Sequence, residues 1–89
     1  MDQSIEQLVG REVVLDAASM YVYLGRVASF DQRYIVLTEA DVHDLRDTST
    51  TRERYVIEAR MHGIRPNRSR VIVDLSQIVS ISPLEDVID

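Results

Sequence analysis

The sequence predicts a small, mainly β domain: a short N-terminal helix, then a strongly bent five-stranded antiparallel barrel with a helix inserted between its third and fourth strands. Residues 21–37 carry the first signal, two β-type runs separated by a polar break at residues 31–33 that is typical of a hairpin turn. Gly25 interrupts the first run, and an interior glycine usually marks a bend or bulge. Short β-type runs also precede and follow this hairpin, so we expect the other strands to be added to it.

The first expected element is a short helix over residues 5–9. Ser4 has the form of an N-cap, with Gln7 three residues later completing a capping box. Ile5 and Leu8 lie three residues apart and therefore share one helix face. We expect this face to pack onto the open end of the barrel.

The first three strands are expected over residues 11–16, 21–30 and 34–42. Because the connection between the first two strands is short, we expect them to be antiparallel neighbours. The second half of the third strand alternates apolar and polar residues, which predicts one face exposed to water.

The polar residues of that alternation are Glu39, Asp41 and His43. Carboxylates and an imidazole at a period of two could gather around a divalent metal ion, which makes these three residues a candidate metal site. The favoured interpretation is an ordinary wet strand face, so we predict no resident metal and no cofactor.

Residues 46–69 form an enlarged connection, and its centre fits two patterns. Apolar and polar residues alternate there as in a strand. Against this, Thr50 and Glu53 form a second capping box, basic residues follow in the last turn, and Gly63 stands where a helix stops. These end signals favour a helix over residues 51–62. We expect the preceding polar stretch, residues 44–51, to lack an apolar anchor.

The C-terminal third begins with a Pro/Asn turn over residues 64–69. Residues 70–75 and 78–82 are then expected as the last two strands. Pro83 ends the second of them, because its missing N–H cannot extend a ladder. Residues 84–89 are acidic and are expected to be a frayed tail.

Composition restricts the class of protein. The chain has 89 residues and makes one domain, whose thin core would gain from oligomerisation. It contains no cysteine, no stretch long enough to span a membrane and no basic-plus-apolar N-terminus, so we expect a cytoplasmic protein with no membrane partner. The net charge of −5 argues against a wholly nucleic-acid-binding surface, but all ten basic residues are arginine and some of them cluster.

Three stretches of the chain resemble the sequence pattern of the Sm-like (LSM-type) family of small β-barrels. They are Ile5-x-x-Leu8-x-Gly10-x-x-Val13-x-Leu15, Gly25-x-Val27-x-x-Phe30-Asp31, and Val71-Ile72-Val73 followed by Ile78-Val79-x-Ile81. The resemblance implies a ring of six or seven copies, paired edge to edge, with single-stranded RNA around the central pore. The resemblance covers about two-thirds of the chain and does not include the enlarged connection, residues 46–69.

The chain resembles a divergent, bacterial-type member, because two RNA-binding features of the family are missing. Sm proteins follow the turn aspartate with an asparagine that reads a base, whereas the only asparagine here is Asn67, far from Asp31. Asp74-Leu75 stand where the family has Arg-Gly, so a carboxylate replaces a cation.

Two other groups of residues are candidates for RNA contacts. Arg33 and Tyr34 follow the turn aspartate, and a guanidinium or an aromatic ring can stack on a base. Arg65, Arg68 and Arg70 lie on the Pro/Asn turn, together with the nearby cationic groups of Arg60 and His62, and could contact phosphates. The competing interpretation is a solvated turn whose arginines pair with surface carboxylates.

These observations predict a non-catalytic, homo-oligomeric Sm-like module that associates with RNA through the basic turn. The chain has no cysteine nucleophile, no Gly-x-Ser-x-Gly elbow and no phosphate-binding glycine loop, and so no enzyme is expected. One alternative is an Sm-like scaffold that has lost RNA binding and holds a protein partner through the inserted helix or the acidic tail. The other is a metal-dependent hydrolase on the Glu39, Asp41 and His43 face.

Overall fold

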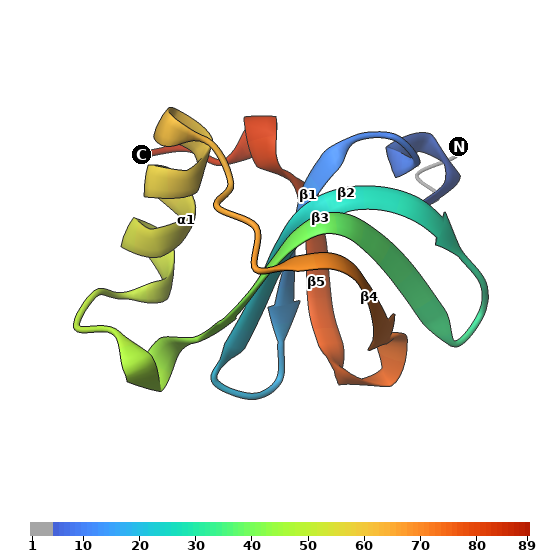
Figure 1. Cartoon of the computed structure of the whole chain (residues 1–89), viewed down its shortest axis with the longest axis horizontal. Coiled ribbons are helices and arrows are strands. Elements are labelled where there is room, and N and C mark those ends of the chain that lie inside the picture. The colour runs from blue at the N-terminus through green and yellow to red at the C-terminus, as the bar shows by residue number, and fades with distance from the viewer. Residues whose placement is uncertain (1–4) are drawn as a thin grey trace.

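The computed structural model describes residues 5–89, which form one strongly bent five-stranded antiparallel sheet and one α-helix (Figure 1). The strands are β1 (Glu12–Ala17), β2 (Tyr21–Phe30), β3 (Tyr34–Asp44), β4 (Arg68–Asp74) and β5 (Ile78–Pro83), and the helix is α1 (Arg52–His62). Four 3-10 helices also occur: η1 (Ile5–Leu8), η2 (Leu45–Asp47), η3 (Leu75–Gln77) and η4 (Leu84–Asp86). The strand order is β4-β3-β2-β1-β5, which confirms the predicted fold class and leaves β4 and β5 as the two edges.

The β2–β3 hairpin is the longest part of the sheet and supplies its bend. The pairing register shifts at Gly25, between Leu24 and Arg26, and again at Ala28, between Val27 and Ser29. A Cβ atom on Gly25 would lie only 3.1 Å from the Cβ of Ala40. The predicted role of this glycine is thus confirmed: β3 approaches β2 so closely that a side chain at position 25 would crowd Ala40.

Two apolar clusters lie on opposite faces of the sheet. Val13 and Leu15 of β1 point into the first cluster, inside the bend, where η1 also packs. Ile5 and Leu8 of η1 contact it, as expected from their shared face, whereas the predicted N-cap Ser4 lies outside the described residues. Val14 points the other way, into a second cluster with α1 and the C-terminal residues. The inserted helix therefore covers a face of the sheet that would otherwise expose valine and leucine.

Helix α1 begins and ends as the capping pattern predicts, with one correction. The N-cap is Thr51, whose hydroxyl accepts a hydrogen bond from the amide of Arg54, and not Thr50. Gly63 ends the helix with a φ of 94°, and its N–H donates to the carbonyl of Ala59 at 2.8 Å. This is the left-handed region, which glycine enters without a steric penalty.

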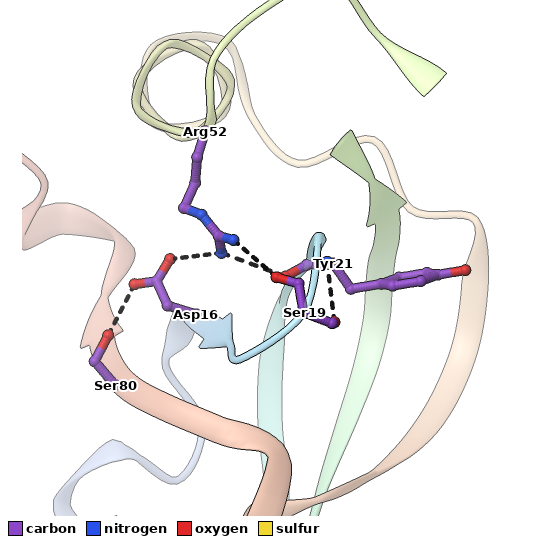
Figure 2. Close-up of polar contacts among 5 residues, drawn as sticks. All are labelled: Asp16, Ser19, Tyr21, Arg52 and Ser80. Carbon is purple, nitrogen blue, oxygen red and sulfur yellow. Dashed lines mark hydrogen bonds and ion pairs between the residues drawn. The ribbon is translucent and has the colours of Figure 1, made fainter. Parts of the chain in front are cut away.

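Arg52, at the first position of α1, ties the helix to the sheet (Figure 2). Its guanidinium donates to Asp16 at the end of β1 and to the backbone carbonyls of Ser19 and Tyr21 in the β1–β2 connection. Asp16 also accepts a hydrogen bond from the hydroxyl of Ser80 on β5, at 2.8 Å. One ion pair thus links α1, β1 and the edge strand β5.

The expectation that Glu39, Asp41 and His43 share one wet face is wrong. Glu39 has a φ of 47°, which breaks the alternation of β3 at that point. Asp41 is consequently only 5% exposed, and the His43 ring stacks on Tyr55 of α1 with 3.9 Å between ring centroids. Among residues 5–89, no group of three or more His, Asp or Glu side chains is placed to hold a metal ion.

Two further expectations about connections are corrected. The polar stretch before α1 does have an apolar anchor, because Leu45 is buried in the second cluster. The acidic tail is not frayed: Leu84 is buried and Val87 packs beside it. Two of its carboxylates form ion pairs with arginines that are distant in the sequence, Glu85 with Arg11 and Asp89 with Arg60.

Within the described part of the chain, no helix is long and apolar enough to cross a membrane.

Candidate nucleic-acid interface

Two turns lie side by side at one end of the β3–β4 pair. One is the β2–β3 turn, and the other is η3 between β4 and β5. The N–H of Leu75 donates to the carbonyl of Arg33 at 2.8 Å, and Tyr34 pairs with Asp74 across the two strands. The sequence pattern had placed both turns in the family's RNA pocket, and the structure does bring them together.

Asp31 organises the first of these turns. Its carboxylate accepts hydrogen bonds from the backbone N–H groups of Arg33 and Tyr34, each at 2.8 Å. These two hydrogen bonds, first that of Arg33 and then that of Tyr34, hold the pKa of the Asp31 carboxyl below its usual value. The carboxylate therefore remains an acceptor and fixes the backbone that presents the next two side chains.

Arg33 and Tyr34 lie beside each other at this end of the molecule, and we call the pair the Arg33–Tyr34 platform. The Arg33 guanidinium carbon lies 5.4 Å from the centroid of the Tyr34 ring, within the range of a cation–π contact. The Tyr34 side chain is not covered, with the residue 38% exposed. An exposed aromatic ring beside a guanidinium offers two planar groups on which a nucleobase can stack.

Asp74, which replaces the cation of the family pattern, caps η3. Its carboxylate accepts a hydrogen bond from the N–H of Ser76 at 2.9 Å. Hydrogen bonds from Ser76 and, to a smaller degree, the charge of Arg33 hold the pKa of Asp74 below its usual value. Asp74 is thus ionised at neutral pH, and this end carries the carboxylates of Asp31 and Asp74 beside one arginine.

The basic turn does not join this platform. Arg68 pairs with Ala40 and Arg70 with Thr38, whereas Asp74 pairs with Tyr34. At about 3.3 Å per residue, Arg70 and Arg68 lie roughly 13 and 20 Å along β4 from Asp74. The predicted RNA contacts therefore divide into two surfaces, the Arg33–Tyr34 platform and a basic strip along β4.

The arginines of the basic strip differ in their partners. The Arg68 guanidinium donates to the carbonyl of Asn67 at 3.1 Å. Arg65 and Arg70 have no ion-pair partner in the region that the structure describes, so both remain available to a ligand. Arg60 and His62, by contrast, lie within ion-pair distance of Asp89 and Glu58.

Asn67 has a structural role that the sequence pattern did not reveal. Its side-chain oxygen accepts from the N–H of Val42, and its amide nitrogen donates to the Val42 carbonyl, both at 3.0 Å. The amide nitrogen also donates to Asp41 at 3.3 Å. Asn67 thus replaces a missing strand partner where β4 begins, and the only hint in the sequence was its place in a Pro/Asn turn.

Comparison with known proteins supports the fold. No family model matches the sequence, and no curated protein matches it either. Among solved structures, the chain is similar to an Sm protein of Pyrococcus abyssii determined in complex with a uridine heptamer. The two share 15% sequence identity, the superposition covers 89% of this chain and 90% of that one, and the TM-score is 0.60. At this identity the match shows that the chain has an Sm-like fold.

Proposed function

We propose that this chain is a non-catalytic Sm-like module that assembles with copies of itself and binds single-stranded RNA. The observation that carries the RNA proposal is the exposed Arg33–Tyr34 platform, held in place by the Asp31 turn. The platform lies on the turn that follows β2. The Sm protein of similar fold was determined in complex with a uridine heptamer. Arg65 and Arg70, which make no ion pair with residues 5–89, provide cations for the phosphates outside the platform.

Self-assembly is supported by the two edge strands. Ile72 on β4 is 54% exposed and Val79 on β5 is 72% exposed, so each edge presents a large β-branched side chain to solvent. Unpaired edges with apolar side chains tend to associate with other strands. Pairing β4 of one copy with β5 of the next would cover both edges, and repetition of that contact closes a ring of six or seven copies.

A non-catalytic role in the cytoplasm is part of the same proposal. Arginine, tyrosine and ionised aspartate at the platform suit the binding of a ligand.

A fluorescence anisotropy titration with a labelled uridine nonamer tests RNA binding. The affinity is expected to fall steeply as salt is raised, because phosphate contacts release counterions. Tyr34→Ala should weaken binding by roughly tenfold or more, since stacking on one aromatic ring contributes about 1–3 kcal/mol per base. Tyr21→Ala removes a tyrosine from the other end of the hairpin and should leave the affinity unchanged. Absence of binding at low salt would refute the RNA proposal.

A second candidate function is a protein-binding scaffold, and one observation favours it. The ionised carboxylates of Asp31 and Asp74 outnumber the single arginine at the platform, and in a ring they would repel phosphate. Recovery of one specific protein partner, together with no salt-sensitive RNA binding, would favour this function instead.

A further inference from the structure

A pocket that several charged residues line lies between α1 and the end of β3, on a different part of the molecule from the Arg33–Tyr34 platform. Its volume is about 310 Å³, at the small end of the roughly 300–1,000 Å³ range of small-molecule sites. Tyr55, Glu58 and His62 line it from one face of the helix, because they are spaced three and four residues apart. Asp41 lines it from β3, and Arg65 lines it from the connection after the helix.

Asp41 is a buried carboxylate whose partners are neutral. One oxygen accepts a hydrogen bond from the Tyr55 hydroxyl, and the other accepts from the Asn67 amide. Burial and the hydrogen bond to Asp41 raise the pKa of Tyr55, so the hydroxyl remains a donor. No arginine or histidine of residues 5–89 pairs with Asp41, and each carboxylate oxygen can accept a further hydrogen bond.

Arg65 and Glu58 supply the other charged groups of the pocket. Arg65 makes no ion pair with any described residue, although its guanidinium is close enough to influence Tyr55 electrostatically. Glu58 is half exposed and shares its carboxylate with Arg54 at 3.5 Å and His62 at 3.4 Å. The pocket thus combines two carboxylate acceptors, Asp41 and Glu58, with one planar donor, Arg65. A ligand that fits it must present donors to the carboxylates and acceptors to the guanidinium.

Building on the proposed function, we propose that this pocket binds a guanine base of the RNA. The guanine Watson–Crick edge carries two adjacent donors, N1–H and the N2 amine, which suit the carboxylates of Asp41 and Glu58. Its O6 and N7 acceptors suit the guanidinium of Arg65, the usual partner of guanine. Uracil places an acceptor on each side of its one donor, so the same carboxylates repel it. The helix insertion therefore adds a base preference to an Sm-like fold.

The test compares two labelled RNA nonamers by fluorescence anisotropy at low salt, one made of uridine alone and one with a single central guanosine. The wild-type protein is expected to bind the guanosine-containing nonamer roughly tenfold more tightly, the discrimination typical of one good base contact. Glu58→Gln, at a half-exposed position, and Asp41→Asn, checked for folding by circular dichroism, should each reduce this ratio to near one. Glu53→Gln makes the same charge change elsewhere on α1 and should keep the ratio.

The outcomes separate this inference from the function on which it rests. Equal affinity for the two nonamers would overturn the guanine pocket while leaving RNA binding intact. A preference for guanosine that survives in Glu58→Gln and in folded Asp41→Asn would also overturn it, because the base would then be read elsewhere. Failure to bind either nonamer would refute the RNA function and the pocket together.

Discussion

Arg52 at the start of α1 donates to Asp16 at the end of β1 with 3.3 Å between Nη1 and Oδ1, and the same guanidinium holds two backbone carbonyls of the β1–β2 connection (Figure 2). Both side chains are less than one-third exposed. Arg52→Ala is therefore expected to lower the free energy of unfolding by about 1–2 kcal/mol, since it leaves a partly buried carboxylate and two carbonyls without their charged donor. Urea denaturation measures this change.

Arg54→Ala on the same helix is the matched control for this prediction. Its side chain is mostly exposed and pairs with Glu58 one turn along α1. Such helix-surface pairs contribute about 0.3–0.5 kcal/mol, so the variant should remain near wild type. Equal effects of the two substitutions would contradict the view that Arg52 holds α1 on the sheet.

Gly25→Ala is expected to destabilise the fold by about 1–3 kcal/mol, the usual cost of overpacking. The new Cβ would lie 3.1 Å from the Cβ and 3.2 Å from the Cα of Ala40, so β3 would have to shift by a few tenths of an ångström to relieve the contact. The double variant with Ala40→Gly should recover part of the loss, which thermal unfolding would detect. Ser29→Ala, on the exposed part of the same strand, should change stability by no more than about 0.5 kcal/mol.

Asp31 is expected to make the β2–β3 turn sensitive to acid. Its pKa in the folded state lies below the unfolded value of 3.8, because backbone N–H groups stabilise the carboxylate. The stabilising contribution is therefore fully present above the unfolded pKa and is lost as the pH falls through the folded pKa. Melting temperatures recorded between pH 5 and pH 2 should fall less in Asp31→Asn than in wild type, whereas Asp47→Asn, on exposed η2, should follow wild type.

Lysine on either edge strand is expected to prevent self-assembly. Ile72→Lys and Val79→Lys each place a charge where the proposed β4–β5 contact would bury an apolar side chain. Native mass spectrometry should then show a monomer of about 10.2 kDa in place of a multiple of that mass. Met61→Lys changes an equally exposed apolar residue on α1 and should leave the assembly intact, and an assembly that persists in both edge variants would contradict the proposed contact.

The elements that the sequence predicted well are those with local signals. The hairpin turn, the bend at Gly25 and the end of α1 at Gly63 each depend on a few neighbouring residues. The end signals of residues 50–63 predict a helix in place of a strand, and the structure confirms the helix. The capping pattern does not separate Thr50 from Thr51, because two adjacent threonines fit it nearly equally well.

The errors arose where distant residues decide the outcome. Glu39 adopts a positive φ that its residue type does not favour, so the change of face at Asp41 could not be anticipated. Asp41 lies 26 residues from Asn67, and Arg60 lies 29 residues from Asp89, so neither contact has a local signature. The candidate RNA residues were identified singly, but their division into a platform and a strip follows from the register of β3 and β4.

The central claim, an Sm-like assembly that binds single-stranded RNA, is tested most directly by light scattering on the native particle at low salt, with and without a uridine nonamer. We expect a particle of six or seven copies of the 10.2 kDa chain that gains the mass of the bound RNA, and a Tyr34→Ala particle of the same size that gains less. A monomer, or an assembly whose mass is unchanged by RNA, would contradict it.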